Sequence, residues 1–293
     1  MSVSVIIRTY NEEKHLGDLL KSIRSKNVDG TELEIIVVDS GSTDRTLDIA
    51  TEYQCNVLHI AKNEFTFGRS LNQGCEAASG DFLVFVSGHC IPENGHWLKL
   101  LLEPLRNGVA AYVYGGQIGG NGSRFSETQI FEKYFPPTSK IPQEGFFCNN
   151  ANAALRKDIW CKNRFNEELT GLEDMELAKR LVQQNMKIAY IADAKVYHLH
   201  DESWLKVRRR YEREAIALQY VMPQVHVHFS DFLRYYVSAV LSDIGCALQE
   251  RKLMAVYREI LMFRLMQYWG TYRGNHEHRK LSKEMKEMYF FPK

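Results

Sequence analysis

Four short runs rich in β-branched and aromatic residues, separated by helical patterns, constrain the fold most. The runs cover residues 3–7, 34–38, 55–60 and 82–86. Between them, apolar residues at helical spacing predict helices that begin near Asn11, near Arg45 and near Leu71. Strands that alternate with helices at this spacing predict a parallel, doubly wound α/β sheet. Ligands of such a sheet bind beyond the carboxyl ends of the strands, where Thr9, Asp39 and Ser87 fall.

The pattern changes along the rest of the chain. After about residue 110 we expect a strand with a Gly-rich loop ("YVYGGQIGGNG"), then a polar loop and short helix ("EGFFCNNANAALRKDIW"). "GLEDMELAKRLVQQN" predicts a helix, and "KIAYIADAKVYHLH" predicts strand, turn and strand. From Trp204 onward the apolar spacing is helical throughout. We therefore predict an α/β domain over residues 1–203 and a C-terminal helical region over 204–293.

Composition excludes several classes of protein. The formal net charge is +1, so no overall positive field favours a nucleic-acid partner. No apolar run approaches the ~18 residues of a membrane span, and "MSVSVII" lacks the layout of a signal peptide. The six cysteines form no CxxC pair, which favours reduced thiols in a cytoplasmic protein.

Four motifs then follow in order: "VSVIIRTYNEE", "EIIVVDSGSTDRT", "LNQGCEAASGDFLVFVS" and "GLEDMELAKRL". Together they resemble family-two glycosyltransferases of the GT-A fold over about residues 1–200. "FTFGRSLNQG" is similar to the bacterial rhamnosyltransferase-type branch, which makes surface polysaccharides. The resemblance implies a mostly parallel, Rossmann-like sheet. It also implies an inverting transfer from a UDP- or dTDP-sugar to a glycan or lipid-linked acceptor, with no organic cofactor.

The resemblance places the nucleotide at the ends of the first strands. Asp39 is expected to accept a hydrogen bond from a pyrimidine N–H, with Thr9 and Asn11 in the neighbouring loop. The alternative is that Asp39 only shapes a turn that caps the next helix. Arg8 stands where the family often has proline, and its guanidinium either contacts the base or phosphate or forms an outward salt bridge.

Further nucleotide contacts are expected after the third and fourth strands. By resemblance, the segment that carries Arg69 and Asn72 approaches the nucleotide, as do Ser87 and Gly88. The alternative for the segment around Arg69 is simple capping of a helix N-terminus.

Catalysis is assigned to the "ED" pair. In the family the acid of this pair takes the proton of the acceptor hydroxyl, which implies that Asp174 is the base and Glu173 an orienting neighbour. A position at a helix start favours the ionised carboxylate. The alternative is that Glu173 and Asp174 are acidic residues of a helix N-terminus without a catalytic role. The loop that precedes the pair in sequence carries Asn149, Asn150 and Asn152. Their amides suit hydrogen bonds to sugar hydroxyls, and the alternative is that these asparagines only shape a turn.

The metal site of the family is altered here. Where relatives carry two metal-binding aspartates one residue apart, this chain has Ser87 and His89. A rebuilt site of His89, His198 and diphosphate oxygens would favour manganese over magnesium. In the competing route, no metal is needed because Arg8, Arg69 or residues 208–210 neutralise the diphosphate.

Two questions stay open at this level. A catalytically silent nucleotide-sugar-binding or scaffold protein of the same fold is the rival to an enzyme. The aromatic and basic tail ("FRLMQYWGTYR") fits a peripheral membrane contact at the inner face of the membrane, a homodimer contact, or a helical cap on the sheet.

Overall fold

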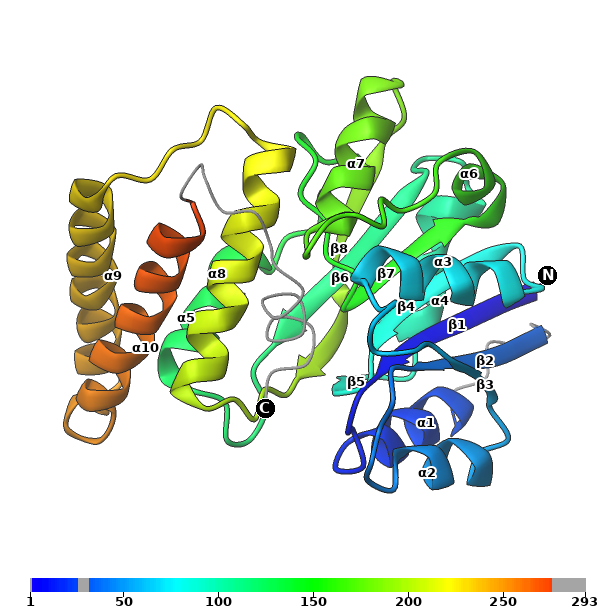
Figure 1. Ribbon diagram of the computed structural model, residues 1–293, viewed down its shortest axis with the longest axis horizontal. Coiled ribbons are helices and arrows are strands. Elements are labelled where there is room, and N and C mark those ends of the chain that lie inside the picture. The colour runs from blue at the N-terminus through cyan, green and yellow to red at the C-terminus, as the bar shows by residue number, and fades with distance from the viewer. Residues whose placement is uncertain (1, 26–31, 276–293) are drawn as a thin grey trace. The chain divides into compact units, whose positions relative to one another are not determined.

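The computed structural model of the protein describes residues 2–25 and 32–275, and these divide into two compact units (Figure 1). The first unit comprises residues up to 120, 134–169 and 173–199. The second comprises residues 121–133, 170–172 and 200–275. The unit that holds the C-terminal helices also takes in residues 121–133 and 170–172, which the prediction placed in the α/β domain, and the division of the chain at residue 204 stays a prediction.

The first unit is built on one mixed sheet with the strand order β3-β2-β1-β4-β7-β6-β8-β5. Strands β1 to β4 run parallel to one another, whereas β7 is antiparallel to both β4 and β6. The predicted α/β class is confirmed, and the sheet is mixed, because the pairs β4–β7, β6–β7 and β5–β8 are antiparallel where a mostly parallel sheet was expected. The strand bounds are β1 Ser2–Thr9, β2 Glu32–Asp39, β3 Asn56–His59, β4 Phe82–Ser87, β5 Cys90–Pro92, β6 Tyr112–Ile118, β7 Asn152–Arg156 and β8 Ile188–His198.

Helices cover both faces of this sheet. Alternate residues of β1, such as Val5 and Ile7, pack in one core with α1 (Leu16–Ser25), α2 (Thr46–Glu52) and α4 (Trp97–Arg106). On the other face α3 (Phe67–Ala77) lies against Ile6 through Gly74, where a Cβ atom would come within 2.5 Å of Ile6 Cγ2. The remaining helices of the unit are α6 (Lys157–Lys162) and α7 (Glu173–Gln183).

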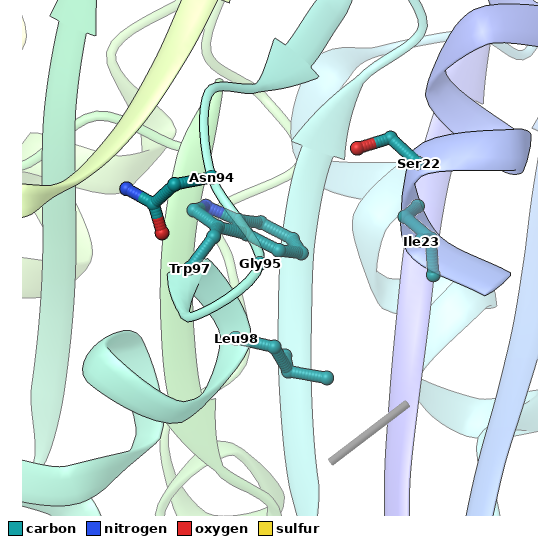
Figure 2. Close-up of a pocket in the computed structure, with 6 residues that line it drawn as sticks. All are labelled: Ser22, Ile23, Asn94, Gly95, Trp97 and Leu98. Atoms are coloured by element: carbon teal, nitrogen blue, oxygen red, sulfur yellow. The ribbon is translucent and has the colours of Figure 1, made fainter. Parts of the chain in front are cut away.

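The core of the first unit is closely packed. Between α1 and the start of α4 lies a cavity of about 10 Å³, lined by Ser22, Ile23, Asn94, Gly95, Trp97 and Leu98 (Figure 2). A space of this size holds about one water molecule. It is therefore a packing defect and not a substrate pocket.

Two predicted elements differ from the structure. The segment "NAALR" forms strand β7, although it was expected to be a loop. The prediction missed the strand because small side chains carry little strand propensity. The segment "IAYIADAKVYH" forms one strand, β8, where strand, turn and strand were expected. The expected turn survives as an irregularity, because Gly115 of β6 pairs with Ile191 and Gln117 pairs with Val196.

The second unit consists of α5 (Phe125–Tyr134), α8 (Trp204–Val221), α9 (Phe229–Gln249) and α10 (Leu253–Gly274). Helices α8 and α10 approach closely at Gly270 and Gly274, where a Cβ atom would lie 2.4 Å from Arg208 O and 2.2 Å from Glu212 O. A buried ion pair joins α9 to α10, with Arg264 donating to both oxygens of Asp243 at 2.7 Å.

The apolar positions of α9 face two directions. Phe232 and Val240 are buried, as the helical spacing predicts. Val237, Leu241 and Leu248 instead remain 50%, 63% and 58% exposed. Among the described residues, no helix combines the length and the apolar character that crossing a membrane requires.

Candidate functional site

The site lies at the carboxyl ends of β1, β2 and β4. In the parallel register Thr9 pairs with Asp39 and Arg8 pairs with Ser87, so the predicted residues of three strands share one edge. The loop after β1 is held against the loop after β2, because Asn11 Oδ1 accepts from the Thr43 N–H at 2.8 Å. Gly88 N donates to Arg8 O at 3.3 Å. The sequence therefore placed these residues together correctly.

The Asp39 carboxylate is fully buried and engaged by its own turn. It accepts from the N–H groups of Gly41 and Ser42 at 2.8 and 3.0 Å, from the Ser42 hydroxyl at 2.5 Å, and from the Thr9 hydroxyl at 3.3 Å. Gly41 suits this turn because its φ of 92° lies in the left-handed region. Asp39 therefore shapes its own turn, as the alternative interpretation expected. A contact with the nucleotide's pyrimidine base would be an additional role.

Arg8 turns toward the "ED" pair. Its Nη1 lies 3.1 Å from Glu173 Oε1, with both side chains mostly buried. The guanidinium also stacks over the Phe67 ring, 5.0 Å from its centroid. Of the two interpretations of Arg8, the salt bridge is the one observed, although it points into the site and not outward.

Asp174 is a buried carboxylate at the start of α7. Burial, and then the charge of Glu173, raise the pKa of Asp174 to about 7, although N–H donors and Arg8 act in the opposite direction. Its oxygens accept from Asn150 N at 2.8 Å and from Met175 N at 2.7 Å. The helix start was expected to favour ionisation, but burial outweighs it. A carboxyl with this pKa can exchange a proton near neutral pH.

The three asparagines before Asp174 have different surroundings. Asn150 N holds Asp174, its Oδ1 accepts from the Tyr112 hydroxyl at 2.5 Å, and its buried Nδ2 has no partner among the described residues. Asn149 Oδ1 accepts from Ala151 N at 3.0 Å, which is turn chemistry. Asn150 thus lies against Asp174 and keeps a donor for a ligand oxygen, whereas the side chain of Asn149 is engaged in its own turn.

Asn152 belongs to the fold instead. Its Oδ1 accepts from Trp97 Nε1 at 2.8 Å, and its Nδ2 donates to the carbonyl oxygens of Gly116 and Ala194 at 2.9 and 2.7 Å. The residue is fully buried in β7. We therefore leave Asn152 out of the sugar-binding set.

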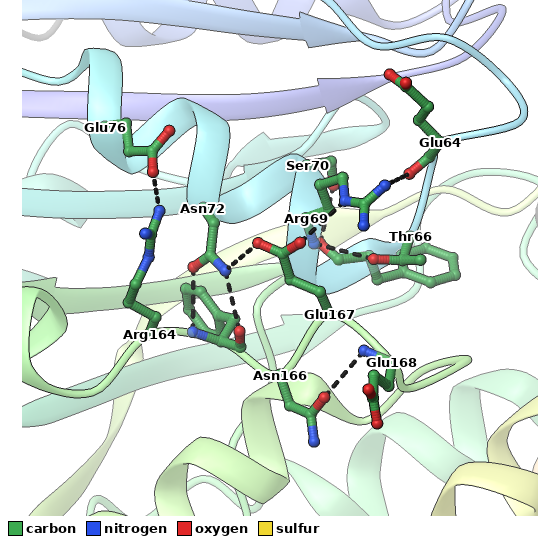
Figure 3. Close-up of polar contacts among 12 residues, drawn as sticks. Glu64, Thr66, Arg69, Ser70, Asn72, Glu76, Arg164, Asn166, Glu167 and Glu168 are labelled. Carbon is green, nitrogen blue, oxygen red and sulfur yellow. Dashed lines mark hydrogen bonds and ion pairs between the residues drawn. The ribbon is translucent and has the colours of Figure 1, made fainter.

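Asn72 is likewise structural (Figure 3). Its Nδ2 donates to Phe165 O and to Glu167 Oε1, both at 2.9 Å, and its Oδ1 accepts from Trp160 Nε1 and Phe165 N at 3.1 Å. These bonds use the full capacity of an amide. Because nothing remains for a nucleotide, we remove Asn72 from the nucleotide site.

Arg69 lies next to Asn72 and is also engaged (Figure 3). Its Nε donates to Glu167 Oε2 at 2.9 Å and its Nη1 to Glu64 O at 3.0 Å. The N-cap of α3 is Thr66, whose hydroxyl accepts from Arg69 N, so the capping alternative is present too. Glu167, which no sequence motif singled out, holds both Arg69 and Asn72.

His89 and His198 face each other across the end of the sheet. Their Nε2 atoms are 3.2 Å apart, and the rings are stacked with centroids 5.1 Å apart. His89 Nδ1 lies 2.7 Å from Glu12 Oε1, and His198 Nδ1 lies 2.6 Å from Gln117 Oε1. Glu12 and Gln117 were not predicted. Only the strand register brings Gln117 next to β8, and no local pattern reveals that.

This arrangement fits a cation between the rings. Glu12 Oε1 and Gln117 Oε1 lie against the two Nδ1 atoms, and a tautomer protonated at Nδ1 in both rings would turn the Nε2 lone pairs toward a shared ion. Ligating histidines are commonly held in this way. Two imidazole nitrogens bound to one ion at about 2.1 Å lie roughly 3.0–3.4 Å apart. Burial raises the pKa of the neighbouring Cys90 thiol, which makes Cys90 a poorer ligand than the imidazoles.

The arginines expected to neutralise a diphosphate without metal are mostly paired with carboxylates. Arg8 is bound to Glu173 and Arg69 to Glu167. In the second unit Arg210 lies 2.9 Å from Glu127 and 2.8 Å from Glu202. This favours a metal-assisted route over a route through these three arginines.

Arg210 belongs to a buried cluster of the second unit with His200, whose Nδ1 lies 2.7 Å from Glu127 Oε1. Burial alone would raise the pKa of Glu127, but the hydrogen bond from His200 and the charges of His200 and Arg210 lower it to about 2. Glu127, His200 and Glu202 could also hold a metal, but Arg210 already balances their carboxylates.

Residues 4–161, more than half of the chain, match the sequence model of a family described as glycosyl transferase family 2. The chain is 31% identical over 191 residues to the O-antigen chain rhamnosyltransferase WbaN of Salmonella anatum, covering 61% of this chain and 60% of that protein. It is 38% identical over 230 residues to the poly(ribitol-phosphate) beta-N-acetylglucosaminyltransferase TarS of Staphylococcus aureus, covering 76% of this chain and 38% of TarS.

Solved structures show the same fold. The mannosyltransferase PcManGT from Pyrobaculum calidifontis, in complex with GDP-Man and Mn²⁺, aligns with a TM-score of 0.64 at 15% identity, covering 92% of this chain and 85% of that one. S. aureus TarS 1–349 in complex with UDP-GlcNAc aligns with a TM-score of 0.52 at 19% identity, covering 96% and 95%. At these identities the likeness concerns the fold, which is that of GT-A glycosyltransferases.

Proposed function

Because this chain belongs to glycosyl transferase family 2, we propose that it is an inverting glycosyltransferase of surface-polysaccharide biosynthesis. The donor is a nucleotide-diphosphate sugar, and the acceptor is a glycan or a lipid-linked sugar. The relatives support this class, since WbaN is named for O-antigen chains and TarS for poly(ribitol-phosphate). The proposed location is cytoplasmic, at the inner face of the membrane.

The observation that carries the proposal is the buried Asp174 at the edge of the sheet. An acceptor hydroxyl must lose its proton as its oxygen attacks the anomeric carbon of the donor. The bond from that carbon to the diphosphate breaks on the opposite face, and the nucleoside diphosphate leaves with the electron pair. Asp174, ionised above a pKa of about 7 and fixed by the N–H of Asn150, receives the proton.

Arg8 and Glu173 position this base. The Arg8 guanidinium pairs with Glu173, the residue that precedes Asp174 in the chain. Arg8 also lowers the pKa of Asp174, against the larger effects of burial and Glu173. The pair therefore orients the start of α7 and sets the pH range in which Asp174 is a base.

The nucleotide is proposed to bind along the ends of β1, β2 and β4. Thr9, Asn11 and Asp39 would hold the nucleoside, and Ser87 and Gly88 would lie by the diphosphate. A Cβ at Gly88 would meet Glu12 Cγ at 2.9 Å, so the chain is tightly packed at this turn. Arg8 and Arg69 would lie at the border of this site. Arg8 is paired there with Glu173, and Arg69 with Glu167.

A divalent metal ion is proposed to bind His89 and His198, because two Nε2 atoms converge there with their Nδ1 atoms held by Glu12 and Gln117. When bound, the ion would neutralise charge on the leaving diphosphate. Imidazole nitrogens favour manganese over magnesium, which prefers oxygen ligands. PcManGT, which has the same fold, was solved with GDP-Man and Mn²⁺, which supports a divalent metal beside a nucleotide sugar.

The test begins with the ligand. Thermal-shift screening of UDP, dTDP and GDP, with and without Mn²⁺, identifies the base, and slow hydrolysis of the matching nucleotide sugar without acceptor then reports the chemistry. We expect hydrolysis in the wild type and its loss in Asp174→Asn. The rival, a catalytically silent nucleotide-sugar-binding protein, requires binding without hydrolysis and without transfer to any acceptor.

A further inference from the structure

Tyr112 of strand β6 places a hydroxyl group inside the core of the first unit. Its side chain is fully buried, and in the sheet it pairs with Leu155 of β7 and with Ile188 of β8. A phenylalanine would fill most of this space without bringing a polar group that needs a partner. Because the large majority of buried hydroxyl groups are hydrogen-bonded, the partner of Tyr112 shows what its hydroxyl group does.

The partner is Asn150, the residue that also binds the proposed base. The Tyr112 hydroxyl donates to Asn150 Oδ1 at 2.5 Å, and the Asn150 N–H donates to Asp174 Oδ2 at 2.8 Å. In the part of the chain that the structure describes, Tyr112 is the only hydrogen-bond partner of the Asn150 side chain, because Asn150 Nδ2 has none. A single residue thus links the Tyr112 hydroxyl to the Asp174 carboxylate.

The Asn150 N–H is one of several groups that act on the Asp174 carboxyl. The titratable and charged groups of the first unit that do so are Glu173 of α7, Arg8 of β1, Tyr112 of β6 and Cys148 of the loop before β7. Burial and then the charge of Glu173 raise the pKa of Asp174, whereas the Asn150 N–H is the largest of the effects that lower it. A hydrogen bond to the ionised form of an acid favours that form. The place of the Asn150 N–H therefore bears on the pH at which Asp174 is a base.

We propose that Tyr112 is a positioning residue for Asp174, because its hydroxyl group holds Asn150 in the place from which the Asn150 N–H binds the carboxylate. The inference rests on the proposed function, in which Asp174 accepts the proton of the acceptor hydroxyl. Without the Tyr112 hydroxyl, both polar ends of the Asn150 amide would be buried without a partner. An amide in that state moves toward other partners or toward water, and the N–H of the same residue then moves away from Asp174.

The test is Tyr112→Phe in the full chain, with turnover in nucleotide-sugar hydrolysis measured from pH 6 to pH 9. Loss of the N–H bond destabilises the ionised Asp174, so the rising limb of the pH–rate profile should move up by about one pH unit. Turnover at pH 7, where about half of the wild-type carboxyl is ionised, should fall about fivefold, and at pH 9 it should approach the wild-type value. A merely structural role would lower turnover by the same factor at every pH.

The matched control is Tyr190→Phe on the neighbouring strand β8. Tyr190 is also buried, but its hydroxyl donates to Pro136 O at 2.8 Å and not to Asn150. Both variants lose one buried hydrogen bond and should lower Tm to a similar extent, whereas the limb of Tyr190→Phe should coincide with that of the wild type. An equal movement of the limb in Tyr190→Phe overturns the inference, and so does an unmoved or lowered limb in Tyr112→Phe.

Asn150→Ala gives a second test of the same contact, which also serves if Tyr112→Phe folds poorly. Its limb should move in the same direction, because the residue loses the side chain that Tyr112 holds. The double variant should move the limb no further than Asn150→Ala alone, since both changes break one chain of contacts. Independent, additive movements of the limb would show that Tyr112 does not act through Asn150.

A readout without substrate separates failure of the inference from failure of the proposed function. Carboxyl ¹³C NMR of aspartate-labelled protein follows the ionisation of Asp174, and Asp174→Asn assigns its resonance. If Tyr112→Phe raises the pKa in this experiment while Asp174→Asn keeps its turnover, Tyr112 positions Asp174 but the proposed base is wrong. If Asp174→Asn loses turnover while Tyr112→Phe leaves the pKa unchanged, the inference fails and the proposed function stands.

Discussion

Asp174 links the chemistry of the site to the stability of the fold. If it is the base, Asp174→Asn should lower turnover by at least ~10²-fold while nucleotide binding survives. In the wild type, turnover should rise with pH through about 7 as the carboxyl loses its proton. A pH–rate profile with nucleotide affinities measured alongside checks both expectations. Near-normal turnover in Asp174→Asn would remove the residue from the mechanism.

Ionisation of Asp174 should lower the free energy of unfolding. Its folded pKa of about 7 lies above the ordinary value of 3.8, so the folded state binds the proton more tightly than the unfolded state. The free energy of unfolding therefore falls as pH rises from about 4 through 7. Asp174→Asn should raise Tm at pH 8 but change it little at pH 4. An equal effect at both pH values would contradict the buried ionisation.

Arg8 offers a separate test of the positioning role. Removing its charge in Arg8→Met takes away an interaction that lowers the pKa of Asp174. The rising limb of the pH–rate profile should then move to higher pH. Arg8→Lys keeps the charge and should leave the limb closer to that of the wild type. If the limb stays in place in Arg8→Met and only KM for the donor rises, Arg8 contacts the nucleotide instead.

The histidine pair predicts a particular metal response. We expect activity to persist in part in excess chelator, with Mn²⁺ stimulating more than Mg²⁺, because the pair offers nitrogen and no carboxylate. His89→Ala should reduce the stimulation by Mn²⁺ without abolishing nucleotide binding, which calorimetry can measure. Complete loss of activity in chelator, restored equally by both ions, would mean that an acidic ligand outside this pair completes the site.

At the scale of elements, the buried pair Asp243–Arg264 joins α9 and α10 in the second unit, and Ser126 of α5 also donates to Asp243 at 2.6 Å. Removing one partner leaves the other charge buried and alone, which typically costs about 3–5 kcal/mol. Asp243→Ala should lower the free energy of unfolding by that amount in denaturant titrations. The control Arg234→Ala, which breaks the pair with Asp231 through its exposed partner and keeps the Asp231 cap of α9, should change it by less than about 1 kcal/mol.

The elements also show what sequence reasoning can reach. The first four strands were predicted because their β-branched runs are continuous, and their shared edge followed from parallel pairing alone. Strand β7 was missed because "NAALR" carries no such run. The roles of Asn72 and Asn152 as buried structural amides depend on partners 93 and 55 residues away, respectively Phe165 and Trp97. Such contacts have no local signature.

For the whole molecule, the exposed stripe of α9 predicts self-association of the helical region. Val237, Leu241 and Leu248 follow a spacing of four and seven residues, the seam of an antiparallel or parallel helix pair. A helix that lies on a membrane would need lysine or arginine beside this stripe, and α9 supplies only Arg234.

We therefore expect the full chain to be a dimer in light scattering and Leu241→Glu to be a monomer. Met254→Glu, at an exposed position of α10, should remain dimeric. A monomeric wild type that binds neutral vesicles through Leu241 would assign this stripe to the membrane.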